Sequence, residues 1–302
     1  MKYIFVINPV AGAGSAEETV HSAIETLPQK DDCLVYVTKS ETDAEDFVRN
    51  TCAAHKGEPM RFIACGGDGT INGVFSGAVG AENVSVSCYP CGSGNDFVKC
   101  FGGAETFMDI GSLLDAPEQK LDLLKVGNKY SVNVTNFGFD TTVAITINKE
   151  REKTGHGNKN AYTKGVVTAL IKSMKNTCTV SADGEVLNPD GKALLCTVAN
   201  GQYVGGSFKC APRAKTDDGF IEVCLIKPIS RLRFVKILTP YTNGEHLDRE
   251  DMKDILVYRR AKKVEVEAPE GFAYSLDGEI IYENKFSIEI CEGALNLAVP
   301  QK

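Results

Sequence analysis

Short apolar runs alternate with amphipathic segments in the first third of the chain. The runs have the length of buried strands, and the segments between them repeat apolar residues at helical spacing. The predicted strands are residues 3–7, 34–37, 62–65 and 84–89, and the predicted helices are residues 17–27 and 43–52. Up to about Asp115, this alternation predicts a doubly wound α/β domain.

The pattern changes after Leu121, where β-branched and aromatic runs separated by turns dominate. Predicted strands are residues 125–135, 194–200, 219–225, 263–267 and 279–284, interrupted by helical segments at 162–175 and 231–238. This part of the chain predicts a mostly antiparallel β domain, which we expect to be a β-sandwich. The last run, residues 286–299, could finish this domain or return to the first.

Three glycine-bearing turns directly follow three of the predicted strands. They are NPVAGAGS at residues 8–15, GGDGTING at 66–73 and PCGSGNDFVK at 90–99. Glycine lets backbone amides approach an anion closely, and the first N–H groups of a helix favour negative charge. Because such turns gather at the carboxyl edge of a parallel sheet, they predict a phosphate site there.

Asp68 lies within the second turn, where a carboxylate would repel phosphate unless a divalent cation lay between them. The surroundings add no positive charge, since residues 1–110 hold 7 Lys or Arg against 15 Asp or Glu. A triphosphate would then be held by backbone amides and metal, which predicts a nucleotide with magnesium.

The third turn carries further polar side chains. Ser93 offers a hydroxyl, and Asn95 and Asp96 can cap a helix that begins at Phe97. For Asp96, helix capping and metal binding are both open.

These motifs, in this order, resemble the three nucleotide loops of the diacylglycerol kinase catalytic-domain family, especially its soluble bacterial lipid kinases. The likeness extends through NVTNFGFDTTV (133–143), GQYVGGSFKCAPRAKTDDGFIEV (201–223) and YSLDGE (274–279). It implies ATP, Mg²⁺ and transfer of the γ-phosphate to a lipid hydroxyl. It also implies an ATP-binding domain at residues 1–120, completed by about 287–302, and a lipid-acceptor domain at 121–286. Which lipid is phosphorylated stays open.

The resemblance assigns roles to individual residues. It implies that Glu279, in the Asp277-Gly278-Glu279 turn, is the general base, with Asp68 and Asp96 as catalytic acidic residues. Spacing alone supports a simple hairpin turn there equally well. The implied nucleotide contacts are Asn8, Gly12, Gly14, Thr38, Gly66, Gly67, Asp68, Gly69, Thr70, Asn72, Gly73, Gly92, Ser93 and Asn95.

Three positions depart from the family pattern. Ser93 stands where threonine is more frequent and keeps the hydroxyl, and Ala11 stands near a frequent serine. Lys99 replaces arginine and lacks its planar fork, which puts any salt bridge or phosphate contact there in question.

A second, structural magnesium site is implied at residues 215–220, KTDDGF. The resemblance places its ligands at the side chain of Asp218 and the carbonyls of Lys215 and Phe220. A solvated β-turn is the alternative.

Composition limits the classes of partner that the protein is expected to bind. A net charge of −7 and a pI near 5.3 argue against nucleic acid. Eleven scattered cysteines suggest reduced, buried thiols, and the spacing of Cys88 and Cys91 is more simply chance than metal binding or redox chemistry. No run of about 18 apolar residues exists. We expect a cytoplasmic enzyme that meets its lipid by reversible membrane contact, through residues 148–164 or 259–263. A homodimer is open.

Two other functions fit parts of the pattern. NAD kinases share the GGDGT loop and a similar two-domain plan, but their acceptor is a soluble nucleotide. A nucleotide-dependent lipid-binding regulator without turnover is the third hypothesis, against which the intact Asp68, Asp96 and Glu279 argue.

Overall fold

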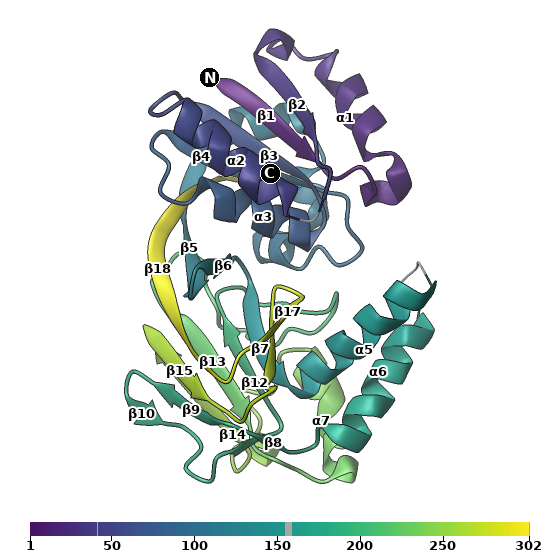
Figure 1. Cartoon of the computed structure of the whole chain (residues 1–302), viewed down its shortest axis with the longest axis vertical. Coiled ribbons are helices and arrows are strands. Elements are labelled where there is room, and N and C mark those ends of the chain that lie inside the picture. Colours follow the sequence, from purple (N-terminus) through teal and green to yellow (C-terminus); the bar gives the residue numbers. More distant parts are fainter. Residues whose placement is uncertain (41, 155–158, 302) are drawn as a thin grey trace. The chain divides into compact units, whose positions relative to one another are not determined.

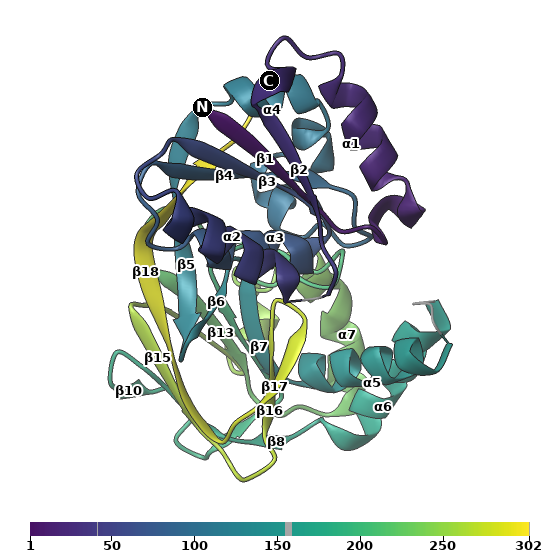
Figure 2. The same cartoon turned by 45° about the horizontal axis from the view of Figure 1, so that its top comes forward.

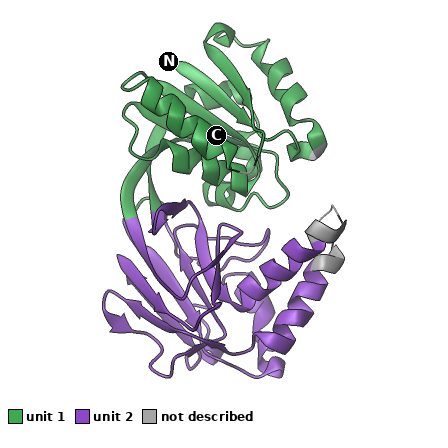
Figure 3. Ribbon diagram, viewed as in Figure 1, with its two compact units in different colours: residues 1–123, 216–218, 291–302 green, residues 124–215, 219–290 purple. Residues whose placement is uncertain are grey.

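The computed structural model describes residues 1–40, 42–154 and 159–301. The chain divides into two compact units (Figure 3). Unit 1 comprises residues 1–123, 216–218 and 291–302, and unit 2 comprises residues 124–215 and 219–290. Neither unit is one continuous segment.

A parallel sheet forms the centre of unit 1 (Figure 1). Its strands are β1 (Lys2–Ile7), β2 (Cys33–Val37), β3 (Met60–Gly66) and β4 (Val84–Pro90), in the order β4-β3-β1-β2. Phe5, Phe62 and Ile63 are fully buried, as expected where helices cover both faces of a parallel sheet.

The helices of unit 1 follow the strands in alternation (Figure 2). They are α1 (Ala16–Ile24), α2 (Asp43–Ala54), α3 (Asp68–Ala78) and α4 (Ile110–Asp115), with 3₁₀ turns η1 (Ala11–Gly14), η2 (Lys30–Asp32), η3 (Phe97–Phe101) and η4 (Ala104–Phe107). Helices α2 and α3 pack closely, since a Cβ on Gly77 would lie 2.6 Å from the carbonyl oxygen of Glu45. The doubly wound α/β prediction is confirmed, although the sequence pattern did not indicate α4.

Unit 2 is built mainly from two antiparallel layers, a six-stranded sheet and the antiparallel part of the ten-stranded sheet that also contains β1 to β4, and a third sheet pairs β11 with β8. The first layer has the order β14-β13-β12-β7-β16-β17, and the second contains β10, β9, β15 and the first part of β18. The bounds are β7 (Val134–Gly138), β12 (Leu195–Ala199), β13 (Ile221–Ile226), β14 (Leu256–Ala261), β16 (Ala273–Leu276), β17 (Glu279–Tyr282), β9 (Thr179–Ala182), β10 (Glu185–Val186), β15 (Lys263–Glu267) and β18 (Lys285–Ala298). Shorter pieces are β5 (Glu118–Val126), β6 (Lys129–Ser131), β8 (Asn176–Thr177), β11 (Lys192–Ala193) and η5 (Glu250–Met252).

Two apolar cores hold unit 2 together. Val198 and Val223 of the first sheet pack with Val264 and Ile288 of the second, which makes the predicted β-sandwich. A separate core joins the first sheet to helices α5 (Phe139–Thr154), α6 (Lys159–Lys172) and α7 (Arg231–Thr242). Among the described residues, no helix is long and apolar enough to cross a membrane.

One predicted strand differs from the structure, one helix of unit 2 was not predicted, and the last run combines the two alternatives considered for it. The strand expected at residues 125–135 is broken, because Gly127 takes a positive φ of 57° and turns β5 into β6, after which β7 starts at Val134. Helix α5 was not predicted. The last run, β18, both finishes the β domain and returns to the first domain. It pairs antiparallel with β15 and, at Asn296 and Leu297, parallel with β4.

Candidate active site

The three glycine-bearing loops of unit 1 are joined by backbone hydrogen bonds. The N–H of Gly12 donates to the carbonyl of Cys91 at 3.0 Å, and the N–H of Cys91 donates to the carbonyl of Gly66 at 2.9 Å. Asn8 donates its N–H to the carbonyl of Cys65 at 3.0 Å. The loops that follow β1, β3 and β4 therefore form one assembly at the carboxyl edge of the parallel sheet, where ligands bind in such folds.

Two of the glycines are required by this close approach. A Cβ on Gly92 would lie 2.4 Å from the Cα of Gly67, and a Cβ on Gly66 would lie 2.3 Å from the hydroxyl oxygen of Thr70. A side chain at residue 92 would push the second and third loops apart, and one at residue 66 would displace the Thr70 side chain at the start of α3. Gly92 thus sets how tightly these loops meet.

Asp68, at the start of α3, ties the second loop to the third. Its Oδ1 accepts hydrogen bonds from the N–H groups of Asp96 at 2.7 Å and Phe97 at 3.3 Å. Burial, and next the charge of Asp96, raise the pKa of the Asp68 carboxyl, although the two N–H groups oppose this. Asp96 does occupy the predicted N-cap position of η3, but its side chain makes no capping hydrogen bond there, and Asp68 supplies the acceptor instead.

Asp96 is almost fully buried and forms an ion pair with Lys99, whose Nζ lies 2.6 Å from Oδ1. A single ammonium is enough for this contact, so the replacement of arginine at Lys99 leaves a salt bridge in place. Next to it, Asn95 has a positive φ of 49° and its side-chain amide brackets Gly92, accepting from its N–H and donating to its carbonyl. The third loop is thus braced from within.

The other predicted nucleotide contacts are distributed over the same edge. The Asn8 amide donates to the Thr70 hydroxyl at 3.4 Å, and the N–H of Thr38 donates to the carbonyl of Ile7 at 2.9 Å. Ser93 is exposed. Gly73 lies within α3, where a Cβ would be 3.3 Å from the Cβ of Ala44, so its small size also serves the contact between α2 and α3.

Glu279 lies in unit 2, just after the turn that joins β16 to β17. Asp277 and Gly278 have positive φ values of 47° and 96°, as in a two-residue hairpin, so the hairpin interpretation is confirmed. The Asp277 carboxylate accepts from the N–H groups of Val132 and Val134, both at 2.8 Å, which anchors the turn to the start of β7.

The half-exposed Glu279 carboxylate forms an ion pair with Lys129 of β6. Sequence reasoning missed Lys129, because nothing in its neighbourhood distinguishes it from an ordinary hairpin lysine. The pair brings together two residues 150 positions apart in the sequence.

Residues 215–220 lie where the chain passes between the units, with Asp218 in unit 1 and both Lys215 and Phe220 in unit 2. Gly219 has a positive φ of 68°, and the carbonyl of Thr216 accepts the N–H of Asp122 at 2.7 Å. Within the described part of the chain, no three His, Cys, Asp or Glu side chains are grouped to hold a metal. A cation here would therefore need carbonyl or water ligands besides Asp218, which is the set that calcium or magnesium accepts.

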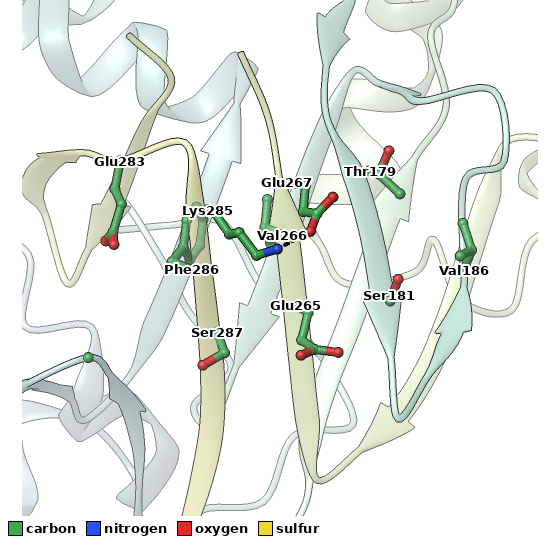
Figure 4. Close-up of a pocket in the computed structure, with 11 residues that line it drawn as sticks. Thr179, Ser181, Val186, Glu265, Val266, Glu267, Glu283, Lys285, Phe286 and Ser287 are labelled. Carbon is green, nitrogen blue, oxygen red and sulfur yellow. Dashed lines mark hydrogen bonds and ion pairs between the residues drawn. The ribbon is translucent and has the colours of Figure 1, made fainter. Parts of the chain in front are cut away.

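A hollow of about 600 Å³ in unit 2 is a poor candidate for a phosphate site (Figure 4). It lies over β9, β15 and β18, and Glu265, Glu267 and Glu283 contribute to its lining. Lys285 is paired with Glu267 at 2.6 Å. The hollow presents net negative charge to a ligand, and none of the predicted site residues lines it.

Two family models match the chain in succession. Residues 2–126 match the diacylglycerol kinase catalytic domain, and residues 133–299 match the YegS C-terminal NAD kinase beta sandwich-like domain. The first match contains all three glycine-bearing loops, and the second contains the Glu279 hairpin.

Curated relatives and solved structures agree with these matches. The chain is 29% identical over 294 residues to "Probable lipid kinase YegS-like" of Alcanivorax borkumensis, covering 96% of this chain and 95% of that protein. It is 26% identical to the diacylglycerol kinase of Bacillus subtilis, covering 91% and 88%. A crystal structure of a diacylglycerol kinase from Bacillus anthracis superposes with a TM-score of 0.74 at 21% identity, covering 99% and 96%, which shows the shared fold. The chain belongs to the diacylglycerol kinase catalytic-domain family of lipid kinases, in the form whose second domain is a YegS-type β-sandwich.

Proposed function

We propose that this protein is an ATP- and Mg²⁺-dependent lipid kinase that transfers the γ-phosphate of ATP to a hydroxyl of a diacylglycerol-like lipid. The observation that carries the proposal is the joining of three glycine-bearing loops at one sheet edge, with Asp68 fixed between them. Backbone N–H groups of these loops and of the start of α3 would bind the triphosphate. The loops are in the acidic part of the chain, so these N–H groups would take the place of the Lys and Arg side chains that bind phosphates in a basic cleft.

The residues around Asp68 fit a divalent cation. Its Oδ1 is occupied by two N–H groups, and a Cβ on Gly94 would lie 2.9 Å from its Oδ2, so glycine keeps space beside that oxygen. The raised pKa of Asp68 reflects a carboxylate held in a buried position near a second negative charge. A bound Mg²⁺ would neutralise charge on the phosphates and on this carboxylate. Asp68 would be its protein ligand, and Asp96 would add negative charge near it.

Glu279 is proposed to take the proton of the acceptor. As the lipid hydroxyl oxygen forms a bond to the γ-phosphorus, the bond from that phosphorus to the ADP oxygen breaks, and the hydroxyl proton passes to the Glu279 carboxylate. The anchored turn holds the start of β17 in place, and Lys129 holds the carboxylate in one orientation. Both contacts support a positioned rather than a freely rotating base.

The named relatives favour a lipid acceptor over NAD, since lipid kinases and a diacylglycerol kinase match nearly the whole length of this chain. A structural magnesium at Asp218 with the carbonyls of Lys215 and Phe220 belongs to the same proposal. The turn at Gly219 supports it by bringing carbonyls and a carboxylate close together in the chain.

The direct test is to offer γ-labelled ATP and Mg²⁺ with diacylglycerol in mixed micelles and, separately, with NAD. Label should appear in the lipid alone. Glu279→Gln should lower turnover by at least about 100-fold while ATP binding, measured by calorimetry, is retained. Glu270→Gln changes an exposed glutamate of the same unit and serves as the matched control. Label in NADP would contradict the proposed lipid acceptor. Full turnover in Glu279→Gln would contradict the role of Glu279 as the base.

A further inference from the structure

The strand β2 ends the ten-stranded sheet that also contains β1, β3 and β4 (Figure 1). It pairs with β1 on one side, and none of the described strands pairs with its other side. The N–H of Thr38 donates to the carbonyl of Ile7 in β1 at 2.9 Å. Because backbone groups alternate in direction along a strand, Val35 and Val37 direct their N–H and C=O groups away from β1. These outward groups, together with the side chains of residues 33–37, are termed the β2 edge.

The β2 edge differs in charge from the other strands at the ends of the two larger sheets. Strand β10 contains Glu185, β14 contains Arg259 and Arg260, and β17 contains Glu279. Residues 33–37, CLVYV, contain no charged side chain. Charged residues on an end strand discourage pairing with other chains, so an open edge without charge indicates that a partner strand covers it.

One face of β2 presents apolar side chains next to this open backbone. Leu34 is 53% exposed. Tyr36, two residues further along on the same face, stacks on Phe47 of α2 with ring centroids 3.6 Å apart, and its hydroxyl donates to Asp43 at 2.9 Å. The tyrosine ring is therefore held in place beside an exposed leucine, an arrangement suited to a contact with a neighbouring strand.

The sequence of β2 and its flanks is complementary to itself in an antiparallel arrangement. With Val35 opposite Val35 of a second copy, Leu34 lies opposite Tyr36, and this pair repeats across the twofold axis. The same register brings Asp31, just before the strand, close to Lys39 of the second copy, just after it. Both side chains are exposed, and neither belongs to an ion pair among the residues that the structure describes. A parallel arrangement would instead bring like charges together.

Neither basic segment that was expected to contact a membrane offers such an edge. In residues 259–263, both arginines pair with glutamates. The segment 148–164 includes residues 155–158, which lie outside the described part of the chain, and its Lys164 pairs with Glu150.

We propose that the β2 edge pairs antiparallel with the β2 edge of a second copy of this chain, forming a dimer with one continuous sheet across a twofold axis. The outward N–H and C=O groups of Val35 would bond their counterparts in the second copy, and Leu34 would pack on Tyr36. The edge favours a second copy over another protein because its charges and apolar side chains complement themselves. The inference goes beyond the proposed function and needs neither ATP nor a lipid.

Sedimentation velocity of the full-length protein in reducing buffer tests the dimer over about a hundredfold range of protein concentration. Wild type should sediment as a dimer that dissociates on dilution. Leu34→Lys should raise the dissociation constant at least about tenfold, because it removes two contacts with Tyr36 and places two ammonium groups near the twofold axis. Val186→Lys is the matched control, since it places the same charge on β10, at the other end of the same sheet, and should leave the dimer unchanged.

Charge reversal tests the register of the two strands. Asp31→Lys alone and Lys39→Asp alone should each weaken the dimer about fivefold, whereas the double variant should regain the wild-type affinity. The differences should shrink at high salt. Because residues 31 and 39 are exposed, this series decides the question even if Leu34→Lys fails to fold by circular dichroism.

Three outcomes would overturn the proposal. They are a wild type that stays monomeric, a dimer unaffected by Leu34→Lys, and a double charge variant as weak as the single ones. Kinase activity does not enter these measurements. An inactive protein that dimerises in this way would therefore refute the proposed function and keep the interface.

Discussion

The carboxylate of Asp68 accepts the backbone N–H of Asp96 at 2.7 Å. This contact joins the first turn of α3 to the loop that follows β4, and it places two acidic residues of separate loops beside each other. Asp68 thus has a structural role that does not depend on a bound cation. A substitution that tests the metal role therefore has to remove the charge of residue 68 and keep the shape of its side chain.

Asp68→Asn makes that separation, because the amide oxygen can still accept from Asp96 and Phe97. Burial and the neighbouring Asp96 raise the Asp68 pKa, so ionisation is less favourable in the folded than in the unfolded chain. The folded state is therefore most stable when Asp68 is protonated. This stability is fully present below the unfolded-state pKa of 3.8 and is lost as the pH rises through the higher folded-state pKa. Without Mg²⁺ at neutral pH, the variant should therefore melt at a higher temperature than wild type, with the difference vanishing in acid.

Adding Mg·ATP should reverse the order of the two melting temperatures, so that wild type melts at a higher temperature than Asp68→Asn. Wild type gains stability from the bound cation, whereas the variant has lost the charge that holds it. Thermal melts with and without Mg·ATP, together with kinase assays, check both parts. A variant with unchanged activity and an unchanged magnesium response would show that Asp68 does not hold the metal.

Gly92→Ala tests how tightly the second and third loops must meet. The new Cβ would lie 2.4 Å from the Cα of Gly67, a backbone atom that cannot rotate away. We expect a loss of about 1–3 kcal/mol in the free energy of unfolding and weaker ATP binding, measured by denaturant melts and calorimetry. Gly69→Ala is the matched control for stability, because nothing lies within 4 Å of its Cβ. Equal stability of the two variants would contradict the close backbone approach.

Asp140, at the start of α5, should make stability depend on pH. Burial raises its pKa to about 6, and its Oδ2 has no hydrogen-bond partner within the described residues. Wild-type stability should therefore fall as pH rises from about 4 to 6. Asp140→Asn should be more stable than wild type above pH 7, by at most about 3 kcal/mol, and equal to it near pH 4. Chemical denaturation at both pH values measures this, and a constant difference would refute it.

The sequence predicted the parts of this site that depend on local pattern. Strands β1 and β3 contain continuous apolar runs, β4 contains β-branched and aromatic residues, and each is followed by glycines, so the shared sheet edge could be predicted. Helix α5 could not, because its side chains are mixed in polarity and its packing depends on contacts with Phe234 and Leu195, which are distant in the chain.

Contacts between side chains and distant backbone were also beyond the sequence. That Asp68, rather than Asp96, caps η3 depends on how two loops meet in space. The pairing of Glu279 with Lys129 likewise depends on the β5–β6 hairpin, which a single glycine at residue 127 creates inside an apparently continuous strand. Local propensity contains no information on either.

The strand β18 has a consequence for how the protein can be dissected. Its first residues pair with β15, and Asn296 and Leu297 pair with β4. A chain terminated after Ile290 would leave β4 with an open edge, which invites association with other molecules. A simple N-terminal fragment should therefore aggregate, and a fusion of residues 1–123 to 291–302 through a short linker, which covers the edge of β4 and lacks only residues 216–218 of unit 1, should stay monodisperse.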